Sequence, residues 1–582
     1  MIKTLAKHIK GFKKESVMTP IFMVLEVLME MTIPLLMASI IDEGIYGGDM
    51  GYIVRTGILM MVCALVGLFA GVMGGIYASK ASAGFARNLR RAMFENIQTF
   101  SFANIDKYST AGLVTRMTTD VTNLQNAYQM ILRMCFRAPF TLIIALIMTF
   151  TINARLASIY FIAMLILGLV FFFLMRATYK YFGQVFERYD ELNASVQENV
   201  SSIRVVKAFV RENHEIKKFD KAVYALYKLF VKAENALVSI SPVMMITSYG
   251  CIIAISWFGA NMIVDSQLTT GELTSMLTYC MNILMSLLMV AMVFVMLSMS
   301  LASAKRISGV LEEKTDLANP KNPIFKVEDG SIRFENVSFS YNTTSEKPVL
   351  KNIDLSIKSG ETVGIIGGTG SSKTSLVNLI GRLYDVTEGK VEVGGIDVRK
   401  YDLETLRDEV AVVLQANVLF SGTILDNLRW GNENATEQEC INACKLACAD
   451  DFIQSFPDKY NTYIEQGGTN VSGGQKQRLC IARALLKKPK ILILDDSTSA
   501  VDTATDAKIR KAFADEIPNT TKIIISQRIA SLENADKIVV MDDGEISGIG
   551  THEELIKSNS IYNEIFVAQT KGSGDFDEKG EI

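Results

Sequence analysis

Long apolar stretches dominate the first half of the chain, whereas the second half has only short ones. A helix that spans a membrane needs about 20 largely apolar residues, and six stretches reach that length, so each is predicted to be a spanning helix. The basic segment before the first stretch could indicate a cleaved secretion signal, but the apolar run is too long for one. The six stretches are Met18 to Ile41, Val54 to Ile76, Met130 to Ile152, Leu156 to Met175, Val238 to Val264 and Leu273 to Leu297.

Charges on either side of the first stretch predict its orientation. Five lysines between Lys3 and Lys14 precede it, whereas Asp42, Glu43 and Asp49 follow it. Because basic flanks favour the cytoplasmic side, both ends of the six-helix array are expected in the cytoplasm. The two long connections on that side are basic and keep a helical pattern, which predicts helical arms with short contact helices near 109–112 and 211–214. Solvated basic loops are the alternative.

Two carboxylates inside the first stretch are candidate substrate contacts. Glu26 and Glu30 are four residues apart and therefore share one helix face. Carboxylates inside a membrane usually face a cavity or pair with another polar group. They could attract a cationic substrate; equally, they could lie near the outer interface or bond a neighbouring helix.

The sixth stretch carries a stripe of methionines. Met285, Met289 and Met292 are its central members, and the spacings of three and four residues continue from Met281 to Met299. Methionine is flexible and polarisable, so the stripe suits a cavity that accepts varied hydrophobic molecules. Packing between helices is the plainer alternative.

Composition narrows the classes of protein. The chain has 582 residues, of which 49% are apolar, and a net charge of only −3, so nothing favours nucleic-acid binding. The eight cysteines include no spaced CxxC pairs and are interpreted as reduced packing residues. Polar residues and two prolines between Glu312 and Gly330 mark a domain boundary. The predicted organisation is a transmembrane domain over 1–311, a linker over 312–330, a nucleotide-binding domain over 331–570 and a disordered tail over 571–582.

A glycine-rich sequence in the second half has the spacing of a phosphate-binding loop. It runs from Gly367 to Thr374 as GGTGSSKT and follows an apolar strand. Its backbone N–H groups would cradle phosphate oxygens, Lys373 would reach the β- and γ-phosphates, and Thr374 would offer its hydroxyl to Mg²⁺. Ser372 stands where glycine is usual, which predicts weakened but not abolished nucleotide binding. The candidate loop residues are Gly367, Gly368, Thr369, Gly370, Ser371, Ser372, Lys373 and Thr374.

The stretch ILILDDSTSAVD places two carboxylates after a buried strand. Ile491 to Leu494 are continuously apolar, as in a parallel strand covered on both faces. Asp495 is predicted to hold Mg²⁺ through water, and Asp496 is placed to polarise the water that attacks the γ-phosphate. Aspartate is ~1.5 Å shorter than glutamate, so the site should bind ATP well and hydrolyse it poorly. A solvated acidic turn is the alternative.

Five motifs together reveal a family resemblance. GGTGSSKT, Gln415, VSGGQ (471–475), ILILD and SAVD (499–502) follow the six apolar stretches in that order. In this combination, nearly the whole chain resembles the ATP-binding cassette (ABC) transporters of the exporter type. The resemblance implies a multidomain fold, in which an all-α six-helix transmembrane domain precedes an α/β nucleotide-binding domain with a helical subdomain. It also implies ATP and Mg²⁺ as cofactors.

The resemblance assigns further roles. Tyr341 would stack on adenine, and Gln415 would sense Mg²⁺ and the γ-phosphate. The signature would bind the γ-phosphate of ATP held by a second cassette, and Asp502 would couple the two sites. The signature residues are Ser472, Gly473, Gly474 and Gln475.

Two positions depart from the family pattern. Asp496 replaces the catalytic glutamate, and Gln527 replaces the switch histidine. The three histidines lie elsewhere, at 8, 214 and 552. Glutamine can hydrogen-bond a phosphate but cannot relay a proton as imidazole does. Both departures predict impaired hydrolysis.

An intact signature beside an impaired site closely resembles the degenerate-site subunit of heterodimeric bacterial multidrug exporters. This resemblance implies a partner half-transporter with the consensus glutamate and histidine, in a bacterial inner or plasma membrane. Hydrophobic or amphipathic compounds, drugs above all, are the expected substrates, with lipids and peptides as alternatives. A regulatory ATP-binding subunit and a slow homodimeric ATPase are the rival interpretations.

Overall fold

The chain divides into two compact units. This computed structural model describes residues 1–341 and 347–577. A helical unit comprises Met1–Gln98 and Ser109–Glu313, and an α/β unit comprises Thr99–Tyr108 and Lys314–Ile582. The α/β unit therefore includes one short segment that comes from the middle of the helical half of the sequence.

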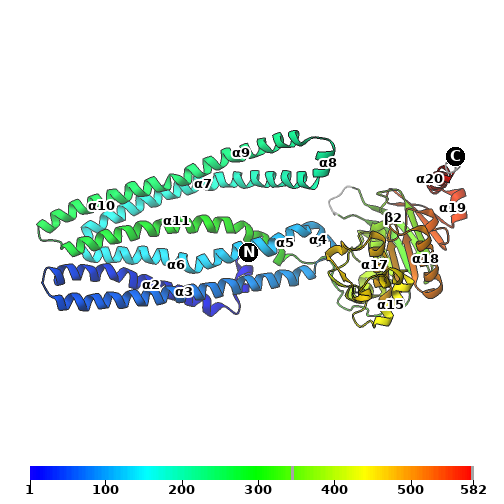
Figure 1. Cartoon of the computed structure of the whole chain (residues 1–582), viewed down its shortest axis with the longest axis horizontal. Helices are drawn as coiled ribbons and strands as arrows, with labels where there is room; N and C mark the ends of the chain where they lie inside the picture. The colour runs from blue at the N-terminus through cyan, green and yellow to red at the C-terminus, as the bar shows by residue number, and fades with distance from the viewer. Residues whose placement is uncertain (342–346, 578–582) are drawn as a thin grey trace. The chain divides into compact units, whose positions relative to one another are not determined.

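The helical unit is built from long helices (Figure 1). Within the described residues, six helical segments are long and apolar enough to cross a membrane, which confirms the predicted number: 13–45, 50–98, 110–152, 154–174, 212–264 and 270–294. The helices are α1 (Ile2–Ala6), α2 (Lys13–Ser39), α3 (Met50–Gln98), α5 (Thr110–Thr115), α6 (Val121–Ile152), α7 (Ala154–Ser201), α8 (Ile203–Ala208), α9 (Glu212–Val238), α10 (Ile240–Val264) and α11 (Thr270–Glu312).

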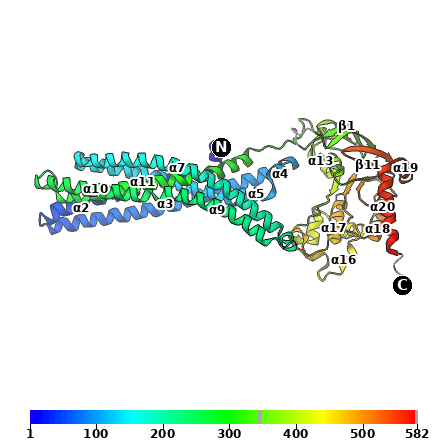
Figure 2. The ribbon, with the colours of Figure 1, turned by 90° about the horizontal axis from the view of Figure 1, so that it is seen from above.

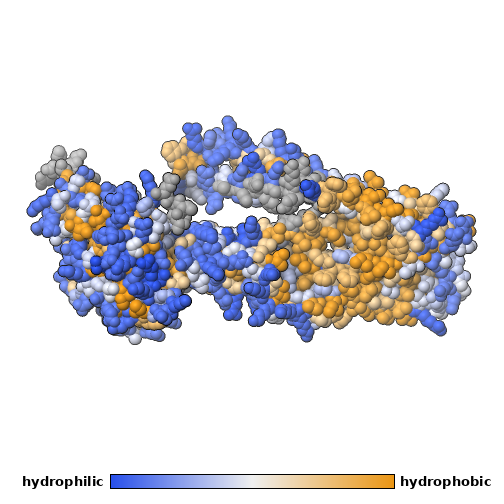
Figure 3. Space-filling view, turned by 180° about the vertical axis from the view of Figure 1, so that it is seen from behind, coloured by the Kyte–Doolittle hydropathy of each residue, from blue (hydrophilic) through white to orange (hydrophobic). Residues whose placement is uncertain are grey.

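The surface of the helical unit matches a membrane environment. Figure 3 shows a broad hydrophobic area over the spanning segments, with hydrophilic residues at the loops beyond it. Large apolar side chains such as Leu68 on α3 and Phe172 on α7 are about 60% exposed there, at 64% and 63%. Exposed apolar surface of this extent is unfavourable in water but favourable against lipid chains.

Polar groups inside the spanning segments are bonded to neighbouring helices. The Tyr279 hydroxyl on α11 donates to the carbonyl of Met31 at 2.6 Å, and Ser275 donates to the carbonyl of Pro34 at 2.5 Å. Both bonds join α11 to α2 beside Pro34, which lies inside α2. Because lipid offers no hydrogen bonds, the hydroxyls of Tyr279 and Ser275 need acceptors within the protein.

Helical arms extend the spanning helices, as the sequence predicted. Helix α3 is continuous to Gln98. Helices α7 and α9 run side by side, and the short helix α8 connects them at one end (Figures 1 and 2). Of the short helices, α4 (Phe102–Tyr108) and α8 end before 109–112 and 211–214, whereas α5 begins at Thr110, within the first of these stretches. Ser109 and Val210 have φ values of 50° and 51° and form the turns that follow α4 and α8.

The α/β unit contains a six-stranded sheet in the order β12-β11-β3-β10-β9-β6, of which only the β11–β12 pair is antiparallel. A second sheet has the order β2-β1-β4-β5, and β7 pairs with β8. The strands are β1 (Ile332–Phe339), β2 (Leu350–Ile357), β3 (Thr362–Gly367), β4 (Glu388–Val393), β5 (Ile396–Asp397), β6 (Val410–Val413), β7 (Gly422–Thr423), β8 (Tyr463–Ile464), β9 (Ile491–Asp495), β10 (Thr521–Ile525), β11 (Lys537–Asp542) and β12 (Glu545–Gly550).

The centre of the six-stranded sheet positions the site. Strand β10 lies between β3 and β9, and Ile525 pairs with Ile365 on one side and Asp495 on the other. All three strands are parallel and almost fully buried. Their carboxyl ends therefore meet at one edge, where open α/β sheets bind ligands.

Helices complete the α/β unit and include the predicted helical subdomain. Leu428, Cys444 and Leu479 come from three helices and share one buried core. The eight cysteines of the chain are free thiols, and most are buried. The helices are α12 (Lys373–Asn378), α13 (Leu403–Glu409), α14 (Ile424–Arg429), α15 (Glu437–Leu446), α16 (Asp450–Gln454), α17 (Gly473–Leu486), α18 (Thr503–Glu516), α19 (His552–Ser558) and α20 (Ser560–Asp577).

The last helix extends beyond the expected end of the domain. Helix α20 runs to Asp577, into the stretch 571–582 for which the sequence predicts a disordered tail. Residues 578–582 lie outside the described residues.

Candidate functional site

The phosphate loop joins β3 to α12 and holds its lysine tightly. The Lys373 ammonium donates to the carbonyls of Gly367 and Gly368 at 2.9 and 2.8 Å and to the Ser371 hydroxyl at 3.0 Å. Burial lowers the pKa of Lys373, and the nearby carboxylates of Asp495 and Asp496 oppose that shift. A cation is thus fixed in the middle of the loop.

The predicted magnesium residues are brought together. The Thr374 hydroxyl donates to the Asp495 carboxylate at 2.8 Å. Thr374 lies in the first turn of α12, which follows β3, and Asp495 ends β9, on the other side of β10. Hard oxygen ligands of this kind suit Mg²⁺. Asp495 is 3% exposed, and burial raises its pKa while the bond from Thr374 opposes the rise. A divalent cation would relieve that desolvation, so the residues present fit Mg²⁺.

Ser372 occupies a backbone conformation that favours glycine. Its φ is 69° and its ψ is 22°, in the left-handed region, at the residue directly before α12. An L-residue there costs roughly 1–2 kcal/mol relative to the right-handed region. Serine in place of the usual glycine therefore strains the backbone of the loop. The sequence alone could not reveal this strain.

Asp496 is held by its backbone at the end of β9. Its φ is 47°, and its N–H donates to the carbonyl of Ile525 at 3.0 Å. Burial raises the pKa of the Asp496 carboxyl, whereas Arg528 and Lys373 lower it. The side chain thus lies in the field of the phosphate-loop lysine, next to the predicted magnesium residues.

Gln527 follows β10 in a segment that we name the switch loop, Ser526 to Ile529. The side chain of Gln527 is exposed, and Arg528 beside it donates to the carbonyls of Ser499 and Val501 at 2.9 and 3.1 Å. The switch loop is therefore bonded to residues 499–502, which follow the two aspartates. Asp502 begins α18, where its carboxylate accepts from the N–H of Thr505 at 2.9 Å.

The signature, Ser472 to Gln475, forms a helix start. The Ser472 hydroxyl accepts from the N–H of Gln475 at 3.3 Å, and the Gln475 side chain accepts from the N–H of Ser472 at 2.9 Å. This capping box begins α17 at Gly473. A Cβ on Gly474 would lie 2.7 Å from the carbonyl oxygen of Ala500, so the close approach requires glycine.

Gln477 fastens the signature helix to the 499–502 loop. Its side chain donates to the Ser499 hydroxyl at 3.3 Å and accepts from the N–H of Ala500 at 3.0 Å. Sequence reasoning missed Gln477 and Arg528 because both act on residues far away in the sequence. The only available signal was their position directly beside a motif.

Tyr341 and Gln415 lie outside the group formed by Thr374, Asp495 and Asp496. The Tyr341 hydroxyl is 2.9 Å from the Ser375 hydroxyl, and its ring meets Tyr384 edge-on, with centroids 5.1 Å apart. Gln415 is exposed after β6, and its carbonyl accepts from Asn417 at 3.4 Å. The structure thus places Tyr341 beside α12, whereas it bonds neither side chain to Thr374 or Asp495 among the hydrogen bonds of the described residues.

Tyr384 connects Tyr341 to helix α4 within the α/β unit. The Tyr384 hydroxyl donates to the Asp106 carboxylate at 2.7 Å, and its ring lies 6.0 Å from that of Phe102. Burial raises the pKa of Tyr384, and Asp106 adds to the rise. One aromatic residue therefore contacts both α4 and the residue expected to stack on adenine.

The two intramembrane glutamates pair with an arginine that the sequence analysis missed. Arg137 on α6 donates to Glu26 at 2.6 Å and to Glu30 at 3.0 Å. The bond to a neighbouring helix, one of the two alternatives, is thus the arrangement present. The Glu26 carboxylate also lies against Gly71, where a Cβ would approach within 3.1 Å. The two carboxylates thus share one guanidinium, and the Glu30 side chain is 43% exposed.

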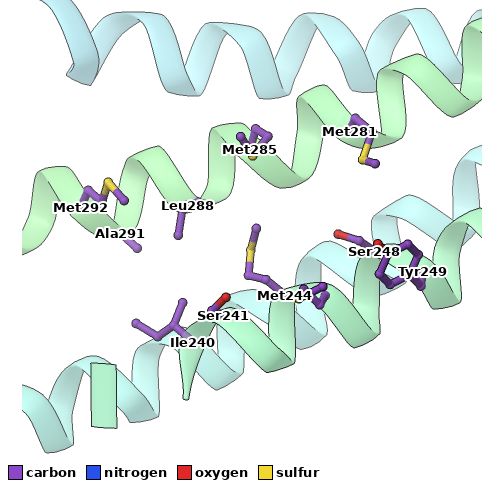
Figure 4. Close-up of a pocket in the computed structure, with 11 residues that line it drawn as sticks. Ile240, Ser241, Met244, Ser248, Tyr249, Met281, Met285, Leu288, Ala291 and Met292 are labelled. Atoms are coloured by element: carbon purple, nitrogen blue, oxygen red, sulfur yellow. The ribbon is translucent and has the colours of Figure 1, made fainter. Parts of the chain in front are cut away.

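A methionine-rich pocket of about 610 Å³ lies between α10 and α11. Met285 and Met292 line it, but Met289 does not: Leu288 occupies that place in the stripe. At about 100° per residue, Met292 and Leu288 lie about 20° and about 60° to one side of Met285 on the helix face, whereas Met289 lies about 40° to the other side. Met244, Met245 and Tyr249 are among the residues of α10 that line the pocket, and Figure 4 shows the two helices facing each other.

Replacing Ser372 tests the backbone strain. Ser372→Gly should raise the unfolding temperature by about 1–3 °C, because the relieved strain exceeds the extra chain entropy of glycine. Ser372→Val should lower it, since β-branched residues fit the left-handed region worst. Scanning fluorimetry of the full chain in lipid measures both. Equal unfolding temperatures for all three proteins would contradict a strained loop.

Replacing Tyr384 tests the attachment of α4. Tyr384→Phe keeps the ring but removes the bond to Asp106, so amide hydrogen exchange over 102–108 should become about fivefold faster. The matched control is Tyr401→Phe, which removes a buried hydroxyl bonded to the carbonyl of Val393 elsewhere in this unit. The attachment is refuted if both variants change exchange in α4 equally.

Charge removal tests the ion cluster in the membrane half. Arg137→Met should destabilise the chain by about 2 kcal/mol, because two partly buried carboxylates lose their partner. Adding Glu26→Gln and Glu30→Gln to that variant should restore most of the loss, as measured by thermal unfolding in lipid. A triple variant no more stable than Arg137→Met would show that the ion pairs are not what holds these helices.

Known proteins resemble the chain along nearly its full length. Residues 17–288 match the ABC transporter transmembrane region, and residues 350–499 match the family described as ABC transporter. An uncharacterized ABC transporter ATP-binding protein of Mycobacterium tuberculosis is 37% identical over 577 residues, which cover 98% of each chain. An ATP-dependent lipid A-core flippase of Desulfotalea psychrophila is 32% identical over 524 residues, covering 88% of this chain and 90% of the flippase.

A solved structure shares the fold. A bacterial Atm1-family ABC exporter with ATP bound superimposes with a TM-score of 0.83 at 23% identity, covering 96% of this chain and 99% of that one. The transmembrane region and the ATP-binding domain are thus matched in one polypeptide by family, by relatives and by fold. The chain belongs to the ABC transporter family.

Proposed function

We propose that this chain is the degenerate-site subunit of a heterodimeric ATP-driven exporter in a bacterial inner or plasma membrane, with both termini in the cytoplasm. The observation that carries the proposal is the combination of Asp496 and Gln527 at the sheet edge with a fully formed, capped signature on α17. A site with altered catalytic residues should hydrolyse its own nucleotide slowly. An ordered signature is useful only to a second cassette.

Nucleotide binding depends on residues that are all present. Lys373 and the phosphate loop would hold the phosphates, and Thr374 and Asp495 would hold Mg²⁺. Mg²⁺ supplies charge neutralisation for the phosphates. Asp496 is too short to place an attacking water as glutamate does, and Gln527 cannot carry a proton. The expected result is ATP that is bound and slowly consumed.

An exposed apolar tip on the arm formed by α7 and α9 supports the proposal that a second chain binds. At this tip, Phe209 is 73% exposed and Val210 is 79% exposed, although both lie outside the spanning segments. Clusters of this kind mark interaction surfaces. The partner would supply the consensus glutamate and histidine, and this chain's Ser472 to Gln475 would complete its site.

The substrate class follows from the membrane half. The pocket between α10 and α11 is lined mainly by methionine and other apolar side chains, which adapt to varied hydrophobic shapes. Hydrophobic or amphipathic compounds, drugs among them, are therefore proposed as substrates. A lipid is the second candidate, because one relative is an ATP-dependent lipid A-core flippase.

The decisive experiment is ATPase activity in lipid. This chain alone should show negligible activity, and co-expression with a partner half-transporter should give robust activity. Replacing the partner's catalytic glutamate by glutamine should abolish it, with a loss of at least about 100-fold. The matched variant of this chain, Asp496→Asn, should leave most of the activity of the complex.

Each rival has its own outcome. Robust activity from this chain alone would establish a homodimeric enzyme and overturn the proposal. A complex that hydrolyses ATP but moves neither a hydrophobic dye nor a fluorescent lipid would favour a regulatory subunit. Comparing dye efflux with lipid flipping in the same vesicles separates the two substrate classes.

A further inference from the structure

The C-terminal helix holds the switch loop through one side chain. The Gln569 amide on α20 donates to the carbonyl of Gln527 at 2.7 Å and accepts from the N–H of Ile529 at 3.0 Å. A single glutamine thus bonds to backbone groups on both sides of Arg528. Neither of these groups lies within β10, which ends at Ile525.

Helix α20 is anchored independently of Gln569. Tyr562 is fully buried, and its hydroxyl lies 2.7 Å from Nδ1 of His552 on α19. Ile565 and Phe566 pack against the main core of the α/β unit. The hydrophobic contacts therefore fix the helix, so the two hydrogen bonds of Gln569 are left to define the position of the loop rather than of the helix.

The loop that Gln569 holds is connected to the rest of the site. Arg528, between the two bonded residues, reaches the carbonyls of Ser499 and Val501. Gln477 then ties that segment to the signature helix. A shift of the switch loop would therefore move hydrogen-bonded neighbours as well as Gln527.

We propose that Gln569 is a positioning residue that sets where the Gln527 side chain meets the γ-phosphate. The inference rests on the proposed role of Gln527 as the phosphate-contacting residue of the switch loop. Because the two hydrogen bonds hold the carbonyl of Gln527 and the N–H of Ile529, they fix the direction in which the Gln527 side chain projects from the loop. The affinity for ATP, which has a γ-phosphate, should depend on this geometry, whereas the affinity for ADP should not.

The test is the preference for ATP over ADP, measured as the ratio of the two dissociation constants for the purified full chain in lipid with Mg²⁺. Gln569→Ala should lower this preference about fivefold, the effect of losing roughly one net hydrogen bond. Gln569→Glu is isosteric and can still accept from Ile529 but cannot donate to the Gln527 carbonyl, so it should lower the preference in the same direction. Asn563→Ala, an exposed change on the same helix, is the matched control and should leave the ratio unchanged.

A double-mutant cycle with Gln527→Ala separates the possible failures. Gln527→Ala should itself lower the ATP preference, and adding Gln569→Ala should cause no further loss. If Gln527→Ala lowers the ratio but neither Gln569 variant does, Gln569 only stabilises the helix and the inference is wrong. If Gln527→Ala leaves the ratio unchanged, the assigned role of Gln527 is wrong and the inference falls with it, whereas the ATPase of the heterodimer still tests the proposed function separately.

Discussion

The parallel alignment of β3, β10 and β9 is the constraint on which the site depends. Ile525, the last residue of β10, pairs with Asp495, the last residue of β9, and with Ile365, two residues before the end of β3, so the three carboxyl ends lie at one edge of the sheet. The phosphate loop, the two aspartates and the switch loop are each the direct continuation of one of these strands. A slip of one strand by a single residue would turn its side chains to the opposite face and separate groups that must meet around one phosphate.

Hydrogen bonds between loops complete what the sheet begins. Arg528 joins the switch loop to the 499–502 segment, Gln477 joins that segment to the signature helix, and Gln569 holds the switch loop from outside. Each of these side chains bonds to main-chain atoms of its neighbour. Parts of the site that are distant in sequence are therefore connected through direct contacts within one unit.

The sequence predicted the features that local patterns determine. Apolar length predicted the six spans, spacing predicted the phosphate loop, and the family resemblance predicted the signature. The sequence did not predict partners that are distant along the chain. Arg137 on α6 bonds to Glu26 on α2, and Gln569 lies 42 positions from Gln527. The backbone angle at Ser372 and the turns at Ser109 and Val210 were equally hidden, because a left-handed residue other than glycine leaves no reliable mark in the sequence. Met289 was misplaced because a stripe of methionines does not reveal which members turn aside.

The way in which Asp496 and Gln527 are held bears on which side chains these two positions can accept. Asp496 is fastened through its N–H to Ile525, and Gln527 through its carbonyl to Gln569, so neither attachment uses the side chain. The framework of the site is thus indifferent to which side chains stand at these two positions. Mutations could exchange the side chains there during evolution while the loops and the signature helix kept their shape.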